Sequence, residues 1–230
     1  MNYQPLKKIY RNSKKKNLAF HHVCEVGVYL PETSNIFDFI KDGVRATLVE
    51  ADPVTIEKIK DFFKGDNIQL FPVAVWDFNG RIKLAKIEAS SFITELKSSP
   101  ALINEKYKVS EENTVEVPCM VFSDIDDGTI DLLSIDIEGG EWYVIKHLKS
   151  RPKIISVETH GKYYTNPFID EIRNWMHNEN YVTWYKDKSD TVFVNANTFL
   201  PNTLDKISTR LAEWALAWKK FKRNFKRDKK

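Results

Sequence analysis

Several apolar runs of this sequence that are typical of buried strands end directly in an acidic residue. These residues are Glu25, Glu50, Asp136 and Glu158. A carboxylate is costly to bury unless something pairs with it. In open α/β sheets, however, ligands bind beyond the carboxyl ends of the strands. We therefore expect these acids to line a crevice at one edge of a sheet. There they could accept hydroxyl groups, hold a cation or take a proton.

The first two acids have neighbours that favour ligand binding. Glu25 precedes Gly27 in "CEVGVYLPETS", and a glycine allows a tight turn and a close approach of the backbone to a ligand. Glu50 ends the second run in "LVEADP", where an acid can accept both hydroxyls of a ribose. The alternative for Glu50 is a surface carboxylate stabilised by a helix dipole. Its position beside Asp52 and Pro53 favours the ribose interpretation.

The catalytic candidates lie later in the chain. Asp136 and Glu138 come from "LLSIDIEGGEW", and Glu158 and His160 from "SVETHG". Glu158 and His160 are two residues apart, so they share a side if the strand continues that far. His160 is either a general base beside a carboxylate or a loop histidine without a role. We expect all four to converge. They also offer ligand types for a divalent cation, but acids are common at such an edge, and no metal site is assigned.

Two further groups of side chains allow two interpretations each. Ser90 and Ser91 stand in an irregular segment, where their hydroxyls can contact a ligand or stabilise a turn. Four aromatic residues either stack on a sugar or pack in the core: Tyr163, Tyr164, Trp184 and Tyr185.

The elements that must position these residues alternate between strand and helix patterns, which predicts parallel βαβ units and an α/β fold. A helix is expected after Asp52, with Pro53 at its first position. Another is expected after Thr33 or Ser34 as N-cap. Residues 67–75 are expected to form the third strand.

The end of the chain's body predicts a hairpin. Residues 181–195 should close the sheet around Lys188 and Ser189, with an antiparallel strand at its edge.

Composition is that of a globular protein, and 230 residues suffice for one α/β domain. Net charge is +3, but the two ends are strongly basic, which leaves the body at about −10. Cys24 and Cys119 are expected as buried free thiols. We see no signal-peptide pattern and no membrane-spanning run, and we expect a cytoplasmic protein. The expected organisation is a basic segment over 1–21, a domain over 22–200 and a basic amphipathic helix over 201–230.

That last segment has a helical apolar stripe. A continuous helix over 204–230 is predicted, with the basic residues Lys206, Lys220, Arg223 and Arg227 away from the stripe. The helix could pack on the body, with Leu211 and Trp214 among the covered residues, or form a coiled coil. Beyond Trp218 its basic run favours an anionic lipid surface, to which it would bind peripherally. The stripe consists of Leu204, Ile207, Leu211, Trp214, Trp218, Phe221 and Phe225.

Six stretches give the chain a family resemblance. "CEVGVYLPETS", "LVEADP", "FPVAVWDFNG", "ASSF", "LLSIDIEGGEW" and "ISVETH" resemble, in order and spacing, the FkbM-type methyltransferases. The resemblance implies a class I (Rossmann-like) fold with a mostly parallel seven-stranded sheet whose last strand is antiparallel. It also implies S-adenosylmethionine as cofactor and methylation of hydroxyl oxygens. Matched residue by residue, it assigns Glu25 and Gly27 to the methionine side of the cofactor, Glu50 to its ribose, and Asp136 and Glu138 to the signature acids.

One departure from the family pattern concerns Pro31, which stands where a glycine is common. Proline fixes φ and removes a donor, so the loop takes another path or binds the cofactor less tightly. We expect Glu25, Gly27, Glu50, Ser91 and Asp136 to bind the cofactor.

The function expected from the sequence is O-methyl transfer to a glycan, glycolipid or related small acceptor. The alternative is a catalytically weak domain that serves as a binding or membrane-recruitment module. Nucleic acid is not the expected partner, because "DIEG" stands where a base-methylating motif with an aromatic residue and a proline would be.

Overall fold

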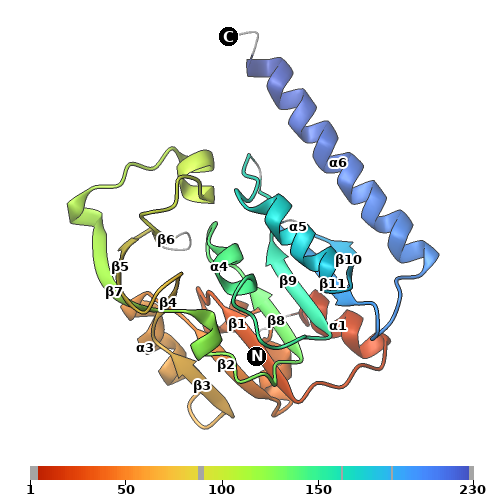
Figure 1. Cartoon of the computed structure of the whole chain (residues 1–230), viewed down its shortest axis with the longest axis horizontal. Helices are drawn as coiled ribbons and strands as arrows, with labels where there is room; N and C mark the ends of the chain where they lie inside the picture. The colour runs from red at the N-terminus through yellow and green to blue at the C-terminus, as the bar shows by residue number, and fades with distance from the viewer. Residues whose placement is uncertain (1–4, 88–90, 162, 188, 228–230) are drawn as a thin grey trace.

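The computed structural model describes residues 5–87, 91–161, 163–187 and 189–227, and it is built around a seven-stranded sheet (Figure 1). The strand order is β10-β11-β9-β8-β1-β2-β3. The strands are β1 (His22–Val26), β2 (Arg45–Val49), β3 (Ile68–Phe71), β8 (Leu132–Ile135), β9 (Ile154–Glu158), β10 (Tyr181–Lys186) and β11 (Asp190–Asn195).

The sheet is parallel except for β11, which runs antiparallel to both of its neighbours, β9 and β10. This is the mostly parallel sheet with an antiparallel last strand that was expected. The position of that strand was wrongly predicted, because β11 lies inside the sheet and β10 forms the edge. After β9 the chain forms β10 at a distance of one strand position from β9. The hairpin then places β11 in the gap between β9 and β10.

A second, four-stranded sheet with the order β4-β7-β5-β6 stands beside the first (Figure 1). The predicted third strand is divided between the two sheets: β3 ends at Phe71 and β4 begins at Ala74. Pro72 between them has no N–H to continue the first ladder. The strands are β4 (Ala74–Val75), β5 (Gly80–Ala85), β6 (Phe92–Ile93) and β7 (Thr114–Met120).

Helices cover both faces of the large sheet, which is usual for parallel strands. One buried cluster contains residues of α4 and α5, and another contains residues of α1, α2 and α3. Cys24 and Cys119 are buried free thiols, as expected. The helices are α1 (Lys8–Lys15), α2 (Phe37–Lys41), α3 (Pro53–Phe62), α4 (Glu141–Ile145), α5 (Ile169–Asn178) and α6 (Thr203–Arg227).

The structure confirms one of the two predicted helix caps. Asp52 accepts a hydrogen bond from the Thr55 amide at 3.1 Å, and Pro53 begins α3. The prediction for Thr33 or Ser34 was wrong: residues 31–33 form a 3₁₀ turn, and α2 begins only at Phe37. The Ser34 hydroxyl donates instead to the Glu25 carboxylate, so a contact across the fold has displaced a local cap.

The basic residues at the start of the chain lie in and around α1, which packs on the domain. Ile9 is buried in the core. Lys14 pairs with Asp42 at 2.8 Å, and Lys16 with Asp205 at the start of α6 at 3.3 Å. Acids of the body therefore neutralise part of the N-terminal charge.

The predicted C-terminal helix is confirmed as α6 over Thr203–Arg227 and projects from the body (Figure 1), while residues 228–230 of the prediction lie outside the described residues. Its polar side holds it to β10: the Thr209 hydroxyl donates to the Trp184 carbonyl at 3.2 Å, and Glu213 pairs with Lys186 at 3.1 Å. The alternative in which the body covers Leu211 and Trp214 was wrong, since they are 66% and 81% exposed. No helix in the described ranges is both long and apolar enough to cross a membrane.

Candidate functional site

A cavity of about 490 Å³ opens where the carboxyl ends of β1, β2 and β8 face the small sheet. Its lining carries several acids and, among the described residues, no lysine, arginine or histidine. Such a lining favours a ligand that carries positive charge. The acids are Glu25, Glu50, Asp52, Asp136, Glu138, Asp187 and Asp190.

Gly27 makes the close approach of β1 to β8 possible at the floor of this cavity. Its φ is +89°, and a Cβ at this position would lie 1.8 Å from the Asp136 carbonyl oxygen. The Gly27 amide donates to the Val49 carbonyl at 2.9 Å, so the same turn also ties β1 to β2. A side chain at position 27 would therefore separate the strands that carry the acids.

Glu25 holds the loop that follows Gly27. Its buried carboxylate accepts hydrogen bonds from the Ser34 hydroxyl and from the Asn35 amide, the latter at 2.9 Å. Burial raises the pKa of Glu25 to about 7. Pro31 is buried at the start of the 3₁₀ turn in this loop. The loop therefore takes a defined path around the proline, and the effect of Pro31 on cofactor affinity stays a prediction.

Glu50 is fixed by main-chain donors from two sides. Its Oε2 accepts from the Val28 amide at 2.8 Å, and its Oε1 from the Ala51 and Asp52 amides at 2.7 and 2.6 Å. Burial raises its pKa to about 7. A carboxylate has about four lone-pair positions. With three of them used, Glu50 lines the cavity in a fixed orientation and can still accept from a ligand.

Ser91 lines the opposite wall, where its hydroxyl accepts a hydrogen bond from the Ile87 amide at 3.1 Å. Ser90 lies outside the described residues. Two acids that the sequence analysis missed, Asp187 and Asp190, also line the cavity. Asp190 begins β11, and an antiparallel strand starts at the edge where its parallel neighbours end. The predicted hairpin was the signal that could have located them.

The stretch after β8 is held together by Glu141, whose role the sequence analysis did not assign. This fully buried carboxylate accepts from the Ile137 and Gly139 amides, each at 3.1 Å, and from the Asn166 side chain. Within that clamp Glu138 has a left-handed backbone, with φ +58°. Such a conformation is uncommon for a residue other than glycine. The clamp therefore sets where Asp136 and Glu138 point.

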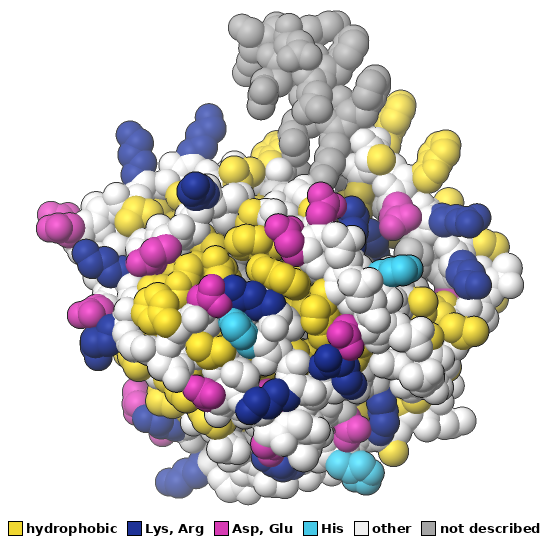
Figure 2. All heavy atoms as spheres, viewed as in Figure 1, with side chains coloured by type: hydrophobic (Ala, Val, Ile, Leu, Met, Phe, Trp, Pro, Cys, Tyr) yellow, Lys and Arg dark blue, Asp and Glu magenta, His cyan; other side chains and the backbone are white. Residues whose placement is uncertain are grey.

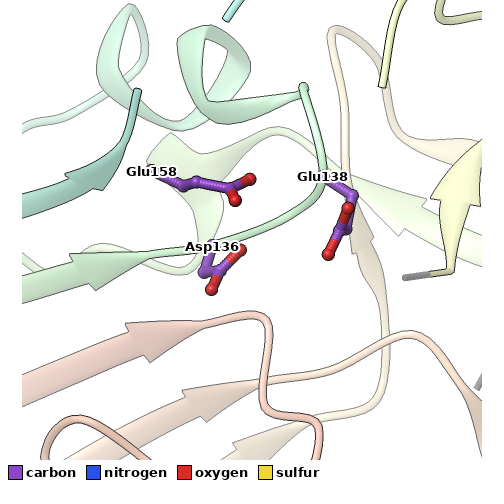
Figure 3. Close-up of side chains that lie close together, drawn as sticks. All are labelled: Asp136, Glu138 and Glu158. Atoms are coloured by element: carbon purple, nitrogen blue, oxygen red, sulfur yellow. The ribbon is translucent and has the colours of Figure 1, made fainter. Parts of the chain in front are cut away.

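Asp136, Glu138 and Glu158 converge from the ends of β8 and β9 (Figure 3). One carboxylate oxygen of each lies within 4.8 Å of the others. Burial and the neighbouring acids raise the pKa of Asp136 well above its usual range and that of Glu158 to about 11. Asp136 and Glu138 line the cavity, so this carboxylate cluster lies at its border.

His160 is not part of this carboxylate cluster, so the expected convergence of all four residues does not occur. β9 ends at Glu158, and the two-residue period of a strand does not extend to His160. Its ring nitrogens lie 2.9 Å from the Thr159 hydroxyl and 3.2 Å from the Asp187 carbonyl.

The four aromatic candidates do not form a common wall for a sugar. Tyr164, Trp184 and Tyr185 are buried, and only Tyr163 is exposed. The hydroxyl of Tyr164 nevertheless lies close to the acids: burial and the charges of Glu141 and Glu158 raise its pKa strongly. Because Tyr164 is in a loop, no strand or helix period in the sequence indicated this position.

Comparisons with known proteins agree with the class that this sheet and cavity define, an S-adenosylmethionine-dependent methyltransferase of class I fold. The model of the methyltransferase FkbM domain matches residues 11–183. The chain therefore belongs to the FkbM methyltransferase family.

Other comparisons are more distant. No curated protein matched the sequence. Two crystal structures of the methyltransferase domain of bacterial CtHen1 align with TM-scores of 0.45 and 0.44, at 12% and 13% identity, each covering 81% of this chain and 94% of the other. A precorrin-6y C5,15-methyltransferase from Geobacter metallireducens aligns with a TM-score of 0.37 at 14% identity, covering 84% of this chain and 91% of the other.

The cavity fits the family's cofactor. Gly27 leaves open the space that a Cβ would fill, and Glu50 offers a fixed acceptor for a ribose. The acidic lining complements the sulfonium and ammonium charges of S-adenosylmethionine.

Proposed function

We propose that this protein is an O-methyltransferase that transfers a methyl group from S-adenosylmethionine to a hydroxyl of a glycan, a glycolipid or a related small acceptor. The observation that carries the proposal is the carboxylate cluster of Asp136, Glu138 and Glu158 at the border of the acidic cavity. It would face an acceptor oxygen beside the cofactor's methyl group. The acceptor class is supported by the family resemblance.

The cofactor, when bound, supplies the methyl group as an electrophile and keeps the electron pair of the broken carbon–sulfur bond on sulfur. Gly27 and Glu50 would hold it, at the turn and at the ribose. The carboxylate cluster would hold the acceptor hydroxyl in line and accept its proton.

Glu50→Ala should weaken S-adenosylmethionine binding by about 1.5–3 kcal/mol, or roughly 10- to 150-fold, because charge-assisted hydrogen bonds to the ribose are lost. Titration calorimetry on the purified protein measures this change. Glu57→Ala is the matched control, since Glu57 is exposed on α3 and does not line the cavity. Wild-type affinity should also fall as the pH is lowered through about 7, where Glu50 takes up a proton.

Transfer itself is tested with tritium-labelled S-adenosylmethionine and extracts of cell glycans and lipids. Label in a glycan or glycolipid fraction, bound through an ether oxygen, is the expected result. Unchanged affinity in Glu50→Ala would remove Glu50 from the site. Cofactor binding without transfer to any fraction would favour the alternative of a binding module without catalysis.

We also propose that α6 attaches the domain to anionic membranes. Its side opposite Thr209 carries the exposed residues Leu204, Ile207, Leu211, Trp214 and Trp218, and hydrophobic side chains stand out on the described part of the helix (Figure 2). The sequence then has eight basic residues and one acid over 219–230. The side chains of Phe221, Phe225, Lys220, Arg223 and Arg227 lie outside the described residues. An apolar stripe followed by cations is complementary to acidic lipid.

The full chain should therefore sediment with vesicles that contain phosphatidylserine, and added salt should weaken this binding. Leu211→Glu combined with Trp214→Glu should reduce it by roughly tenfold or more, since two apolar side chains that would enter the lipid are lost. Leu200→Glu is the control, because Leu200 is 67% exposed and precedes the helix. Equal sedimentation of all three proteins, or of none, would argue against a membrane role.

A further inference from the structure

The carboxylate cluster brings acidic side chains from the ends of two neighbouring strands close together. Its three carboxylates approach within 4.8 Å of one another. The charges that act most strongly on Glu158 are also negative, and they include Glu141 and Asp190. Like charges at such distances repel strongly when they are shielded from water. Such proximity therefore favours either protonation of these acids or the binding of a cation between them.

A second observation comes from two buried oxygens, one belonging to this carboxylate cluster and one close to it. Glu158 is only 7% exposed, and within the described residues its Oε2 has no hydrogen-bond partner. Figure 3 shows its carboxylate directed toward those of Asp136 and Glu138. The hydroxyl of Tyr164, with 0% exposure, likewise lacks a partner in that part of the chain. Buried polar atoms normally have partners, so these two indicate a missing ligand.

We infer that Asp136, Glu138 and Glu158 bind a divalent cation, with Tyr164 positioned to hydrogen-bond a ligand or water on it. The donors are all oxygens, which suits a hard ion such as Mg²⁺, Mn²⁺ or Ca²⁺. As a feature of the methyltransferase site, the inference rests on the proposed function. There the ion would orient a hydroxyl of the acceptor and make it more acidic.

The test is the binding of Mn²⁺ to the full-length protein after treatment with EDTA and desalting. The loss of the free Mn²⁺ signal in electron paramagnetic resonance measures binding without any reaction. We expect one saturable site, weakened at least about tenfold by Glu158→Gln or by Asp136→Asn. Mn²⁺ should also raise the melting temperature of the wild type and leave that of Glu158→Gln unchanged.

The control is Glu50→Gln, which lines the same cavity outside the carboxylate cluster and should bind Mn²⁺ like the wild type. Absence of a saturable site, or equal binding by wild type and Glu158→Gln, would overturn the inference. Cofactor titration in EDTA is the separate readout for the proposed function, so either can fail alone.

Discussion

Gly27→Ala should destabilise the protein by more than about 4 kcal/mol and abolish cofactor binding. The new Cβ would lie 1.8 Å from the Asp136 carbonyl oxygen and 2.8 Å from the carbonyl carbon. Both are main-chain atoms, so no side chain can rotate away. β1 and β8 would have to separate at the point where the acids of both strands border the cavity. Urea unfolding measures the stability, and calorimetry the affinity for S-adenosylmethionine.

The matched control for this substitution is Gly43→Ala. Gly43 has a φ of +81°, close to the +89° of Gly27, but a Cβ there meets nothing within 4 Å. Its cost should be only the left-handed backbone, about 1–2 kcal/mol, with cofactor binding intact. The difference between the two variants isolates the contact with Asp136. If both variants lose the same stability, that contact has no energetic importance.

Glu141→Ala should lower the free energy of unfolding by about 3–5 kcal/mol. Glu141 is fully buried, and its removal leaves the Ile137 and Gly139 amides and the Asn166 side chain without their acceptor. The loop could then relax from the left-handed conformation at Glu138, which would also loosen the carboxylate cluster. Urea unfolding again provides the measurement.

Glu141→Gln is the conservative comparison for that substitution. Its amide oxygen can still accept from the two main-chain amides, whereas its NH₂ group would face the donor of Asn166. An intermediate loss of about 1–2 kcal/mol is expected. A stability of Glu141→Ala within about 1 kcal/mol of the wild type would show that the clamp is not needed.

The parts of the fold that could be predicted are those set by the short-range repeat of apolar residues in the sequence and by helix-start residues. Alternating strand and helix patterns gave the α/β class, and the Asp52-Pro53 pair located the start of α3. The meeting of acids at one edge also followed, because parallel strands end on the same side of a sheet. Asp136 and Glu158 are brought together in this way.

The rest depended on contacts between residues far apart in the sequence. Ser34 looks like a helix cap, but it bonds to Glu25, nine residues earlier. Residues 67–75 look like one strand, yet Pro72 divides them between two sheets. The position of His160 depended on where β9 ends, and strand ends are poorly determined by pattern alone. Tyr164 lies near the acids but belongs to a loop, and loop residues follow no strand or helix repeat from which the position of a side chain could be predicted.

The place of β11 inside the sheet has a consequence for how the protein is made. Until residues 190–195 leave the ribosome, β9 has an unpaired edge and β10 has no neighbour. Such an open edge is a template for pairing with other chains. Asp190, which belongs to the cavity wall, is also supplied by this strand. The nascent protein thus passes through a stage in which an edge of its sheet can pair with other chains and its binding site lacks Asp190, and β11 ends both conditions.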